Sequence, residues 1–356
     1  MKIFASGVGV IVSLELRQRV RGVAWYVLLG IFVGLVAIVT VLLTIALRGL
    51  SSGGAGGGGA GGGIYSTIIY FVLLLGTLVA PALSGNAING DREAGTLATT
   101  QVTLITTWQL VLGKFLAAWI TALAFLAVAV PFLIYSAFLG GLSAASIVIS
   151  VLVLAVELGV IAAIGVGLSG ILNRPLFSIV ATYLAVATLS IGTLIAFALG
   201  GLVVQTPQTM TISSGLTYDD NGKATTCGPA VATTNNLPRF DYFWGFLVAN
   251  PYILLADAVP AQFDAAGNPT DLFGSVKSGV RSAQIPPKSQ VAYDECSPDY
   301  PNDTLSPSAE KVISSTAAGW LVGLLIQLVL AVAAIMGAWA RTRTPAGRLS
   351  RGSRIA

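Results

Sequence analysis

Long apolar stretches separated by short polar connections dominate the sequence. Six of them run for about 20 residues or more with at most one charged side chain, which is the length a helix needs to cross roughly 30 Å of hydrocarbon. They cover residues 23–47, 64–88, 115–139, 143–172, 176–204 and 317–340. Backbone groups in lipid must form their hydrogen bonds internally, and the alternating strands of a closed barrel are absent, so each stretch is predicted to be a membrane-spanning helix.

One further apolar and aromatic segment, 242–259, lies before the sixth stretch. Asn250-Pro251 interrupts it and Asp257 ends its apolar run after about fifteen residues, which is too short for a span. A seventh crossing would also place the arginine-rich tail on the opposite side from the N-terminus. A pair of short re-entrant or interfacial helices is therefore predicted.

The segment before the first span, residues 1–22, joins apolar positions to Arg17, Arg19 and Arg21. It runs into the first span without a small-residue cleavage site, so a cleaved signal peptide is rejected. An amphipathic helix on the inner membrane surface is predicted, with its arginines towards the headgroups. A solvated basic tail is the alternative.

Composition and charge support a membrane protein and predict its orientation. Hydrophobic residues make up 55% of the chain and charged residues 10%, with a net charge of +4. Basic residues gather in the segments that lie inside if both termini are cytoplasmic, including the tail 341–356, whereas most acidic residues lie in the block 205–316. The positive-inside rule then predicts a multi-pass protein of the cell membrane with cytoplasmic N- and C-termini. The basic face is interpreted as membrane orientation and contact with lipid, not as nucleic-acid binding.

The external block 205–316 is predicted to be an extended, loop-rich cap that includes the re-entrant segment. It contains both cysteines, Cys227 and Cys296. An even pair outside the membrane predicts a disulfide that closes a long loop. Two unpaired thiols are the alternative.

Catalytic and cofactor motifs are missing from the sequence. The glycine-rich run 53–63 lacks the Lys-Ser or Lys-Thr that ends a phosphate-binding loop, and Gly113-Lys114 is followed by Phe115. The chain has no histidine and no cluster of metal-ligand residues. We therefore expect no enzyme activity, metal or cofactor on this chain.

A short polar run stands out between the second and third spans. It comprises Asp91, Arg92, Glu93, Ala94, Gly95, Thr96 and Leu97, and Leu110-Val111-Leu112-Gly113-Lys114 follows it. In this topology the connection 90–107 faces the cytoplasm. Its spaced apolar positions favour a docking surface, although an ordinary solvated turn has a similar pattern.

These two elements resemble the E-x-G-T-L and L-G-K signature of permease subunits in the type 2 exporter family of ATP-binding-cassette (ABC) transporters. The surface helix, the six spans and Asn250-Pro251 before the last span fit the same pattern. Two departures are visible: a proline common before L-G-K is absent, with Leu104 and Ile105 in its place, and the external block is longer than is usual in the family.

The resemblance implies a mechanism. Two permease copies, or this chain and a related permease, would form a dimer that binds two separate ABC ATPase subunits, which carry ATP and Mg²⁺. The connection 90–107 would be the coupling helix, with Asp91, Arg92, Glu93, Gly95, Thr96 and Leu97 as contact residues. The surface helix around Glu15 would be a second contact, and substrate would be exported along the dimer interface.

Glu157 is the one charged residue inside a span. Such residues usually face the bundle interior or a cavity and often mark a translocation pathway. A neutral or hydrogen-bonded glutamate that joins two helices is an equal alternative.

Two other classes of function stay open. A secondary transporter or channel needs more intramembrane polar groups or inverted repeats than this chain has. A membrane-anchored envelope scaffold or sensor would use the external block as its binding module. An ATPase that co-purifies with the chain would favour the exporter, whose substrate the apolar spans suggest to be amphiphilic or hydrophobic.

Overall fold

A computed structural model describes residues 2–51, 60–97, 105–213, 217–218, 224–226, 228–294 and 307–343. Within these residues, six helical segments are long and apolar enough to cross a membrane. They are α2 (Val23–Ser51), α3 (Ala60–Ser84) continued by α4 (Asn89–Glu93), α6 (Thr107–Phe138), α7 (Ala144–Ile171), α8 (Pro175–Ala187) continued by η1 (Thr188–Gly192) and α9 (Thr193–Val203), and α14 (Trp320–Thr342). The protein is a mostly helical, multi-pass membrane protein.

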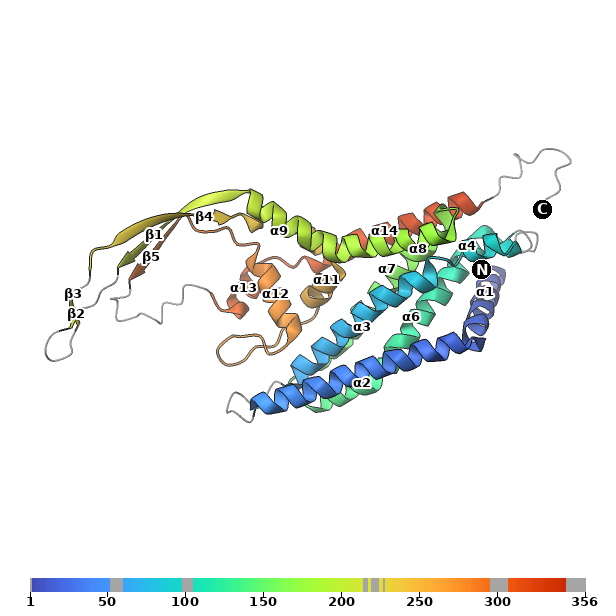
Figure 1. Ribbon diagram of the computed structural model, residues 1–356, viewed down its shortest axis with the longest axis horizontal. Helices are drawn as coiled ribbons and strands as arrows, with labels where there is room; N and C mark the ends of the chain where they lie inside the picture. The colour runs from blue at the N-terminus through green and yellow to red at the C-terminus, as the bar shows by residue number, and fades with distance from the viewer. Residues whose placement is uncertain are drawn as a thin grey trace.

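The bundle has two distinct ends (Figure 1). The first, which we call the α1 end, carries α1 (Lys2–Arg21), α4, the start of α6 and the ends of α7 and α14. The second, which we call the sheet end, carries the 205–316 block. The N-terminal helix and the connection between the second and third spans therefore share one end, opposite the 205–316 block.

Helix α7 lies at the centre of the bundle and packs closely on α14. Gly167 faces Ala334, and Gly170 faces Ala338 so closely that an added methyl group would meet its Cβ. Small residues at such contacts allow helix backbones to approach in lipid, where no hydrophobic force drives the helices together. The fifth span, formed by α8, η1 and α9, is the least buried of the six.

The third span starts earlier than the sequence predicts. The prediction placed its start at residue 115, but α6 begins at Thr107. Thr106 forms a capping box with Gln109: its side chain accepts from the Gln109 N–H, and the Gln109 side chain accepts from the Thr106 N–H. The L-G-K element therefore lies within the first two turns of a helix.

The described residues of the 205–316 block include strands that the sequence analysis did not predict. Its described residues form a three-stranded sheet in the order β4-β1-β5, in which β1 (Gln205–Ser213) is antiparallel to β4 (Val231–Pro238) and parallel to β5 (Gln290–Asp294). Strands β2 (Thr217–Tyr218) and β3 (Ala224–Thr226) pair antiparallel in a second, two-stranded sheet. Threonine-rich, β-branched sequence favours these strands. Strand β1 follows directly from α9 and projects away from the bundle (Figure 1).

Residues 240–258 form short helices, and none of the six candidate spans among the described residues lies there. They are η2 (Phe240–Tyr242), α10 (Gly245–Val248) and α11 (Pro251–Ala258). Gly200 and Gly201 on α9 make room for the rings of Phe243 and Phe240, because a Cβ at either glycine would overlap them. These rings fasten the short helices to the fifth span.

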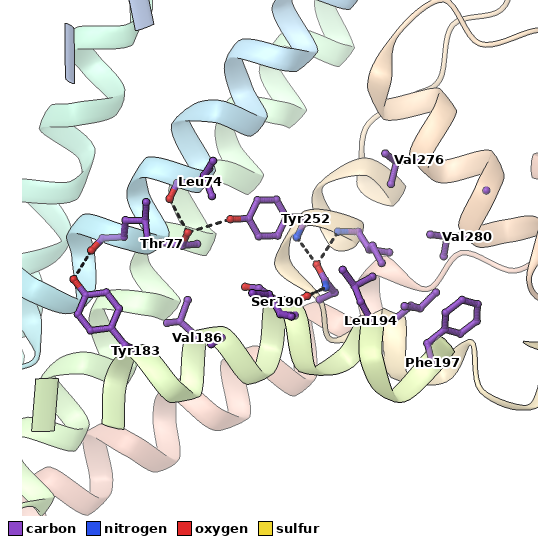
Figure 2. A pocket seen from close by; sticks show the side chains of 17 residues that line it. Leu74, Thr77, Tyr183, Val186, Ser190, Leu194, Phe197, Tyr252, Val276 and Val280 are labelled. Carbon is purple, nitrogen blue, oxygen red and sulfur yellow. Dashed lines mark hydrogen bonds between the residues drawn. The ribbon is translucent and has the colours of Figure 1, made fainter. Parts of the chain in front are cut away.

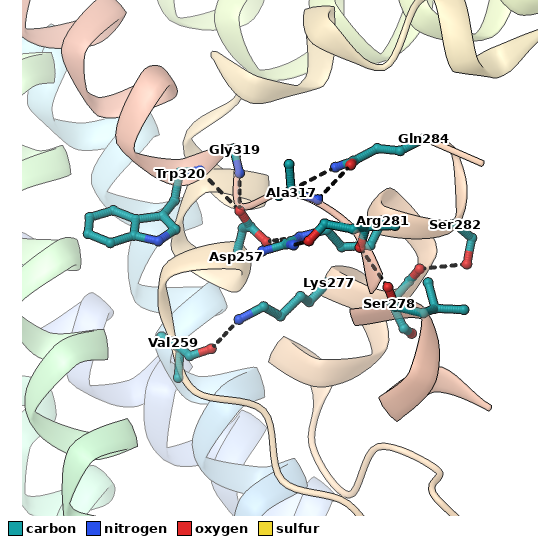
Figure 3. A network of polar contacts seen from close by, with 12 residues as sticks. Asp257, Val259, Lys277, Ser278, Arg281, Ser282, Gln284, Ala317, Gly319 and Trp320 are labelled. Atoms are coloured by element: carbon teal, nitrogen blue, oxygen red, sulfur yellow. Dashed lines mark hydrogen bonds and ion pairs between the residues drawn. The ribbon is translucent and has the colours of Figure 1, made fainter. Parts of the chain in front are cut away.

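A polar cluster around Asp257 joins α11 to the start of α14 (Figure 3). Its carboxylate accepts from the Arg281 side chain of α12 (Leu272–Ser282) at 2.7 Å and from the backbone N–H groups of Gly319 and Trp320 at 2.8 and 3.0 Å. An acidic group at a helix N-terminus is favourable because the unpaired N–H groups carry partial positive charge. Nearby Lys277 donates to a backbone carbonyl, and burial lowers the pKa of its amine. A further helix, α13 (Ala309–Ser315), completes this region.

Candidate functional site

Lys114 is the centre of the polar patch at the α1 end. Only 2% of its side chain is exposed, and its Nζ lies 2.5 Å from Glu15 Oε1 on α1 and 2.7 Å from Asp91 Oδ2 on α4. A buried charge is tolerated when it is paired and hydrogen-bonded. Two carboxylates from separate elements therefore bind α1 and α4 to α6 through one ammonium group.

The glycine of the L-G-K element has a matching steric role. A Cβ on Gly113 would lie 2.7 Å from Ile11 Cβ, and one on Gly7 would lie 2.5 Å from Gln109 Nε2. The Gln109 amide in turn donates to the Phe4 carbonyl at 3.3 Å. Helix α1 therefore packs in close contact on the first turns of α6, and the glycine permits the approach that the lysine then holds.

Arg92 caps the end of α7. Its Nη1 donates to the Leu172 carbonyl at 2.9 Å and to Asn89 Oδ1 at 2.5 Å, and its Nη2 reaches the Gly170 carbonyl at 3.5 Å. The last carbonyls of a helix have no partner within the helix and carry partial negative charge, so a guanidinium satisfies both needs. Ser169 Oγ also accepts the backbone N–H of Asn89 at 3.0 Å.

The remaining residues of the polar run face water. Glu93, Gly95 and Thr96 are exposed, and Leu97 is half-buried. Gly95 has φ of +71°, which a residue without a Cβ adopts without strain, and nothing lies within 4 Å of where its Cβ would be. Residues 98–104 of the connection lie outside the described part of the chain. The predicted contact set thus divides: Glu15, Asp91 and Arg92 hold helices together, whereas Glu93, Gly95 and Thr96 are exposed. The Thr96 hydroxyl also donates to the Asp91 carbonyl at 3.3 Å.

Glu157 is buried in the bundle, with 1% of its surface exposed. Its Oε1 has no hydrogen-bond partner among the described residues, and neither has Oε1 of Gln327 on α14, with which it interacts. The Gln327 amide nitrogen donates to the Ala249 carbonyl at 3.1 Å.

A cavity of about 610 Å³ lies between α3, the fifth span, the short helices α10 and α11, and α12 (Figure 2). Its walls are mainly apolar. The lining residues are Leu74, Thr77, Leu78, Tyr183, Val186, Ala187, Ser190, Ile191, Leu194, Phe197, Leu247, Asn250, Tyr252, Ile253, Val276, Gly279 and Val280. Glu157 does not line it.

A few polar groups sit in this apolar wall. Thr77 Oγ1 lies 3.0 Å from the Tyr252 hydroxyl, and the Tyr183 hydroxyl donates to the Leu78 carbonyl at 2.7 Å. Ser190 Oγ is buried and has no hydrogen-bond partner among the described residues. Mostly apolar walls with a few polar groups are typical of sites for small amphiphilic ligands.

Asn250 joins the two sides of the cavity. Its Nδ2 donates to the Ser190 carbonyl at 2.6 Å and to Thr193 Oγ1 at 2.9 Å, and its Oδ1 accepts the N–H groups of Tyr252 and Ile253. The asparagine thus caps α11, whose first residue is Pro251, and supplies a donor to the π-helical turn η1. Single π-helical turns within α-helices are frequent at functional sites.

Sequence reasoning identified Asn250-Pro251 as a helix break but not this bond across the cavity. It missed the cavity itself, because the polar residues come from three distant segments. Cys227 and Cys296 lie outside the described residues, so their pairing stays a prediction. No protein-family model matches the chain, and no curated protein matches it either.

Proposed function

We propose that this protein is the permease subunit of an ATP-driven exporter that resembles the type 2 family of ABC transporters. One observation carries the proposal. The two segments of the resemblance meet at Lys114, and beside that junction Glu93, Gly95 and Thr96 are exposed at the α1 end. This arrangement suits a contact with a separate ATPase subunit, which would bind ATP and Mg²⁺ while this chain is no enzyme and binds neither.

The internal bonds of the polar run suit transmission of force. Asp91 ties α4 to α6, and Arg92 ties it to the end of α7. A push on the exposed turn at Glu93 would therefore reach three spans instead of being absorbed by a loose loop. Helix α1, held by Glu15, would form the second contact on the same cytoplasmic face of the cell membrane.

The cavity between α3 and the fifth span supports an amphiphilic or hydrophobic substrate. Its volume and apolar walls suit such a molecule, and the Ser190 hydroxyl has no hydrogen-bond partner among the described residues. The least buried span forms one wall, so a second permease copy or a related permease would complete the pathway there. Export is the direction that the family resemblance implies.

The test is co-expression with candidate ABC ATPases, purification, and reconstitution into vesicles. We expect an ATPase to co-purify and its ATP turnover to rise with amphiphilic compounds. Glu93→Ala should uncouple ATP turnover from transport without loss of protein, and Gly95→Pro should do the same because proline cannot adopt a positive φ. Glu310→Ala, an exposed glutamate at the sheet end, is the matched control. Absence of any ATPase partner, or equal effects of Glu93→Ala and Glu310→Ala, would reject the proposal.

The projecting sheet favours a second candidate function, an envelope scaffold or sensor. Most of β4 is exposed, although it pairs with β1. In that case the spans would serve as an anchor, and disrupting the sheet would abolish activity while Glu93→Ala would not.

A further inference from the structure

A second apolar cavity, of about 460 Å³, lies between α6, α7 and α14 towards the α1 end. Every lining residue is apolar or aromatic, and none is charged. They are Trp108, Leu112, Phe115, Trp119, Val156, Gly159, Val160, Ala163, Leu328, Ala331, Val332, Ile335 and Met336. We call this cavity the α6–α14 groove; the function proposed above does not use it.

The aromatic side chains of the groove present mainly ring surfaces. The Trp119 indole N–H donates to the Ala155 carbonyl at 2.8 Å, and its ring stacks on Phe115 at 5.9 Å between centroids. Gly159 leaves room for that ring, because a Cβ there would lie 3.0 Å from the indole nitrogen. The groove therefore offers little hydrogen bonding to a polar ligand and suits hydrocarbon.

The rim of the groove at the α1 end has a different character. Trp108 stacks on Trp339 at 5.2 Å, and the Arg343 guanidinium lies 5.3 Å from the centre of the Trp339 ring. Trp339 and Arg343 continue the helix face that carries Val332 and Met336, since they follow at helical spacing. Tryptophans at this level are typical of a membrane interface, and an exposed guanidinium binds phosphate well.

We propose that the α6–α14 groove binds an acyl chain of an anionic phospholipid whose phosphate contacts Arg343. The apolar groove, the tryptophan pair and the cation follow one another in the same order as the chain, interface and headgroup of such a lipid. A second copy of the chain is a poorer occupant, because a twofold interface here would bring two Arg343 side chains together without an anion between them.

The test uses the full chain in lipid nanodiscs and its own tryptophan fluorescence. Brominated acyl chains quench tryptophans that they contact, and three tryptophans lie in or beside the groove. In one series, brominated phosphatidylglycerol is mixed in increasing amounts with unbrominated phosphatidylcholine. In the second series the bromine is on phosphatidylcholine and phosphatidylglycerol is unbrominated, and the quenching in the two series is compared. We expect an about fivefold preference for the anionic lipid, which corresponds to one basic side chain near a membrane surface.

Matched variants locate the site. Arg343→Gln should remove the preference and Arg343→Lys should retain most of it. Arg341→Gln should have no effect, because Arg341 is exposed on the last turn of α14, whereas it is Arg343 that lies over the Trp339 ring. Ala163→Phe, which fills the groove, should reduce quenching by both lipids.

Three outcomes would overturn the proposal. The wild type could show equal quenching by the two lipids, or Arg341→Gln could act as strongly as Arg343→Gln. Finally, Ala163→Phe could leave the quenching by both lipids the same as in the wild type. The groove would then be covered by protein instead of lipid. None of these measurements depends on an ATPase partner, so their failure is distinct from failure of the proposed exporter function.

Discussion

The α1 end and the large cavity are held together in opposite ways. At the α1 end, close glycine contacts and a buried ammonium group between two carboxylates join α1, α4 and α6. At the cavity, one asparagine side chain spans the gap between α11 and a π-helical turn. The first arrangement resists change because breaking it leaves buried charges unpaired. The second can exchange a few neutral hydrogen bonds at low cost.

This difference suits an exporter in which one end transmits force and the other rearranges around substrate. A rigid junction moves as a unit, whereas a cavity that opens must contain bonds that break readily. Ser190 takes part in both the hydrogen bonding and the lining of the cavity. Its carbonyl accepts from Asn250, while its hydroxyl has no hydrogen-bond partner among the described residues.

Lys114→Ala should have the largest effect on stability. It removes the single cation between Glu15 and Asp91 and leaves two carboxylates close together without a partner. Breaking a buried ion pair costs about 3 kcal/mol or more. We expect a lower unfolding temperature in detergent and faster proteolysis of α1. Lys311→Ala, at an exposed lysine of the sheet end, should change neither; equal behaviour of the two variants would contradict the rigid junction.

Gly113→Ala tests the same junction by overpacking. The new methyl group would overlap Ile11 and force α1 away from α6. Overpacking costs about 1–3 kcal/mol. Gly279→Ala is the matched control, because Gly279 is exposed on α12 and has nothing within 4 Å of its Cβ position. That variant should be neutral or slightly stabilising, since alanine favours a helix. A neutral Gly113→Ala would show that α1 is not held in close contact.

Asn250→Ala should have a smaller effect on stability but a clear local one. It removes the cap of α11 and the bond to η1, a loss of about 1–2 kcal/mol. Hydrogen exchange should accelerate at residues 188–193 and 251–254 while exchange in α6 stays unchanged. Asn235→Ala, at an exposed asparagine of β4, is the control. Exchange that rises equally throughout the bundle would show that the cavity is not a separate, softer region.

The spans were predictable from sequence because length and apolarity are local properties. The start of α6 was not predictable, because the charge of Lys114 indicated the polar boundary of a span. In the structure Lys114 is buried and pairs with Glu15 and Asp91. This pairing joins residues that are far apart in the sequence, so no local pattern indicates it. The pairing of β1 with β5 escaped prediction for the same reason, since about eighty residues separate Thr209 from Gln290.

The candidate site was predictable to different degrees in its two parts. The polar run and its partner element were visible as a motif, but sequence could not separate the internal Asp91 and Arg92 from the exposed Glu93. Neighbouring residues on a helix face different directions, and only the packing of α6 and α7 decides which side is buried. The cavity could not be predicted from the sequence, because Thr77, Ser190 and Tyr252 come together only when three separate segments pack.

Glu157→Gln should have the smallest effect and decides between the two interpretations of Glu157. The structure buries the carboxyl beside Gln327 and away from the cavity wall. Glutamine has nearly the same size and shape and can form hydrogen bonds at the same position. We therefore expect an unchanged unfolding temperature, transport rate and pH dependence of transport. Glu157→Leu, which removes the hydrogen-bonding group beside Gln327, should lower stability by about 1–3 kcal/mol. If Glu157→Gln instead altered the pH dependence of transport, the carboxyl would exchange protons during the cycle and would belong to the pathway.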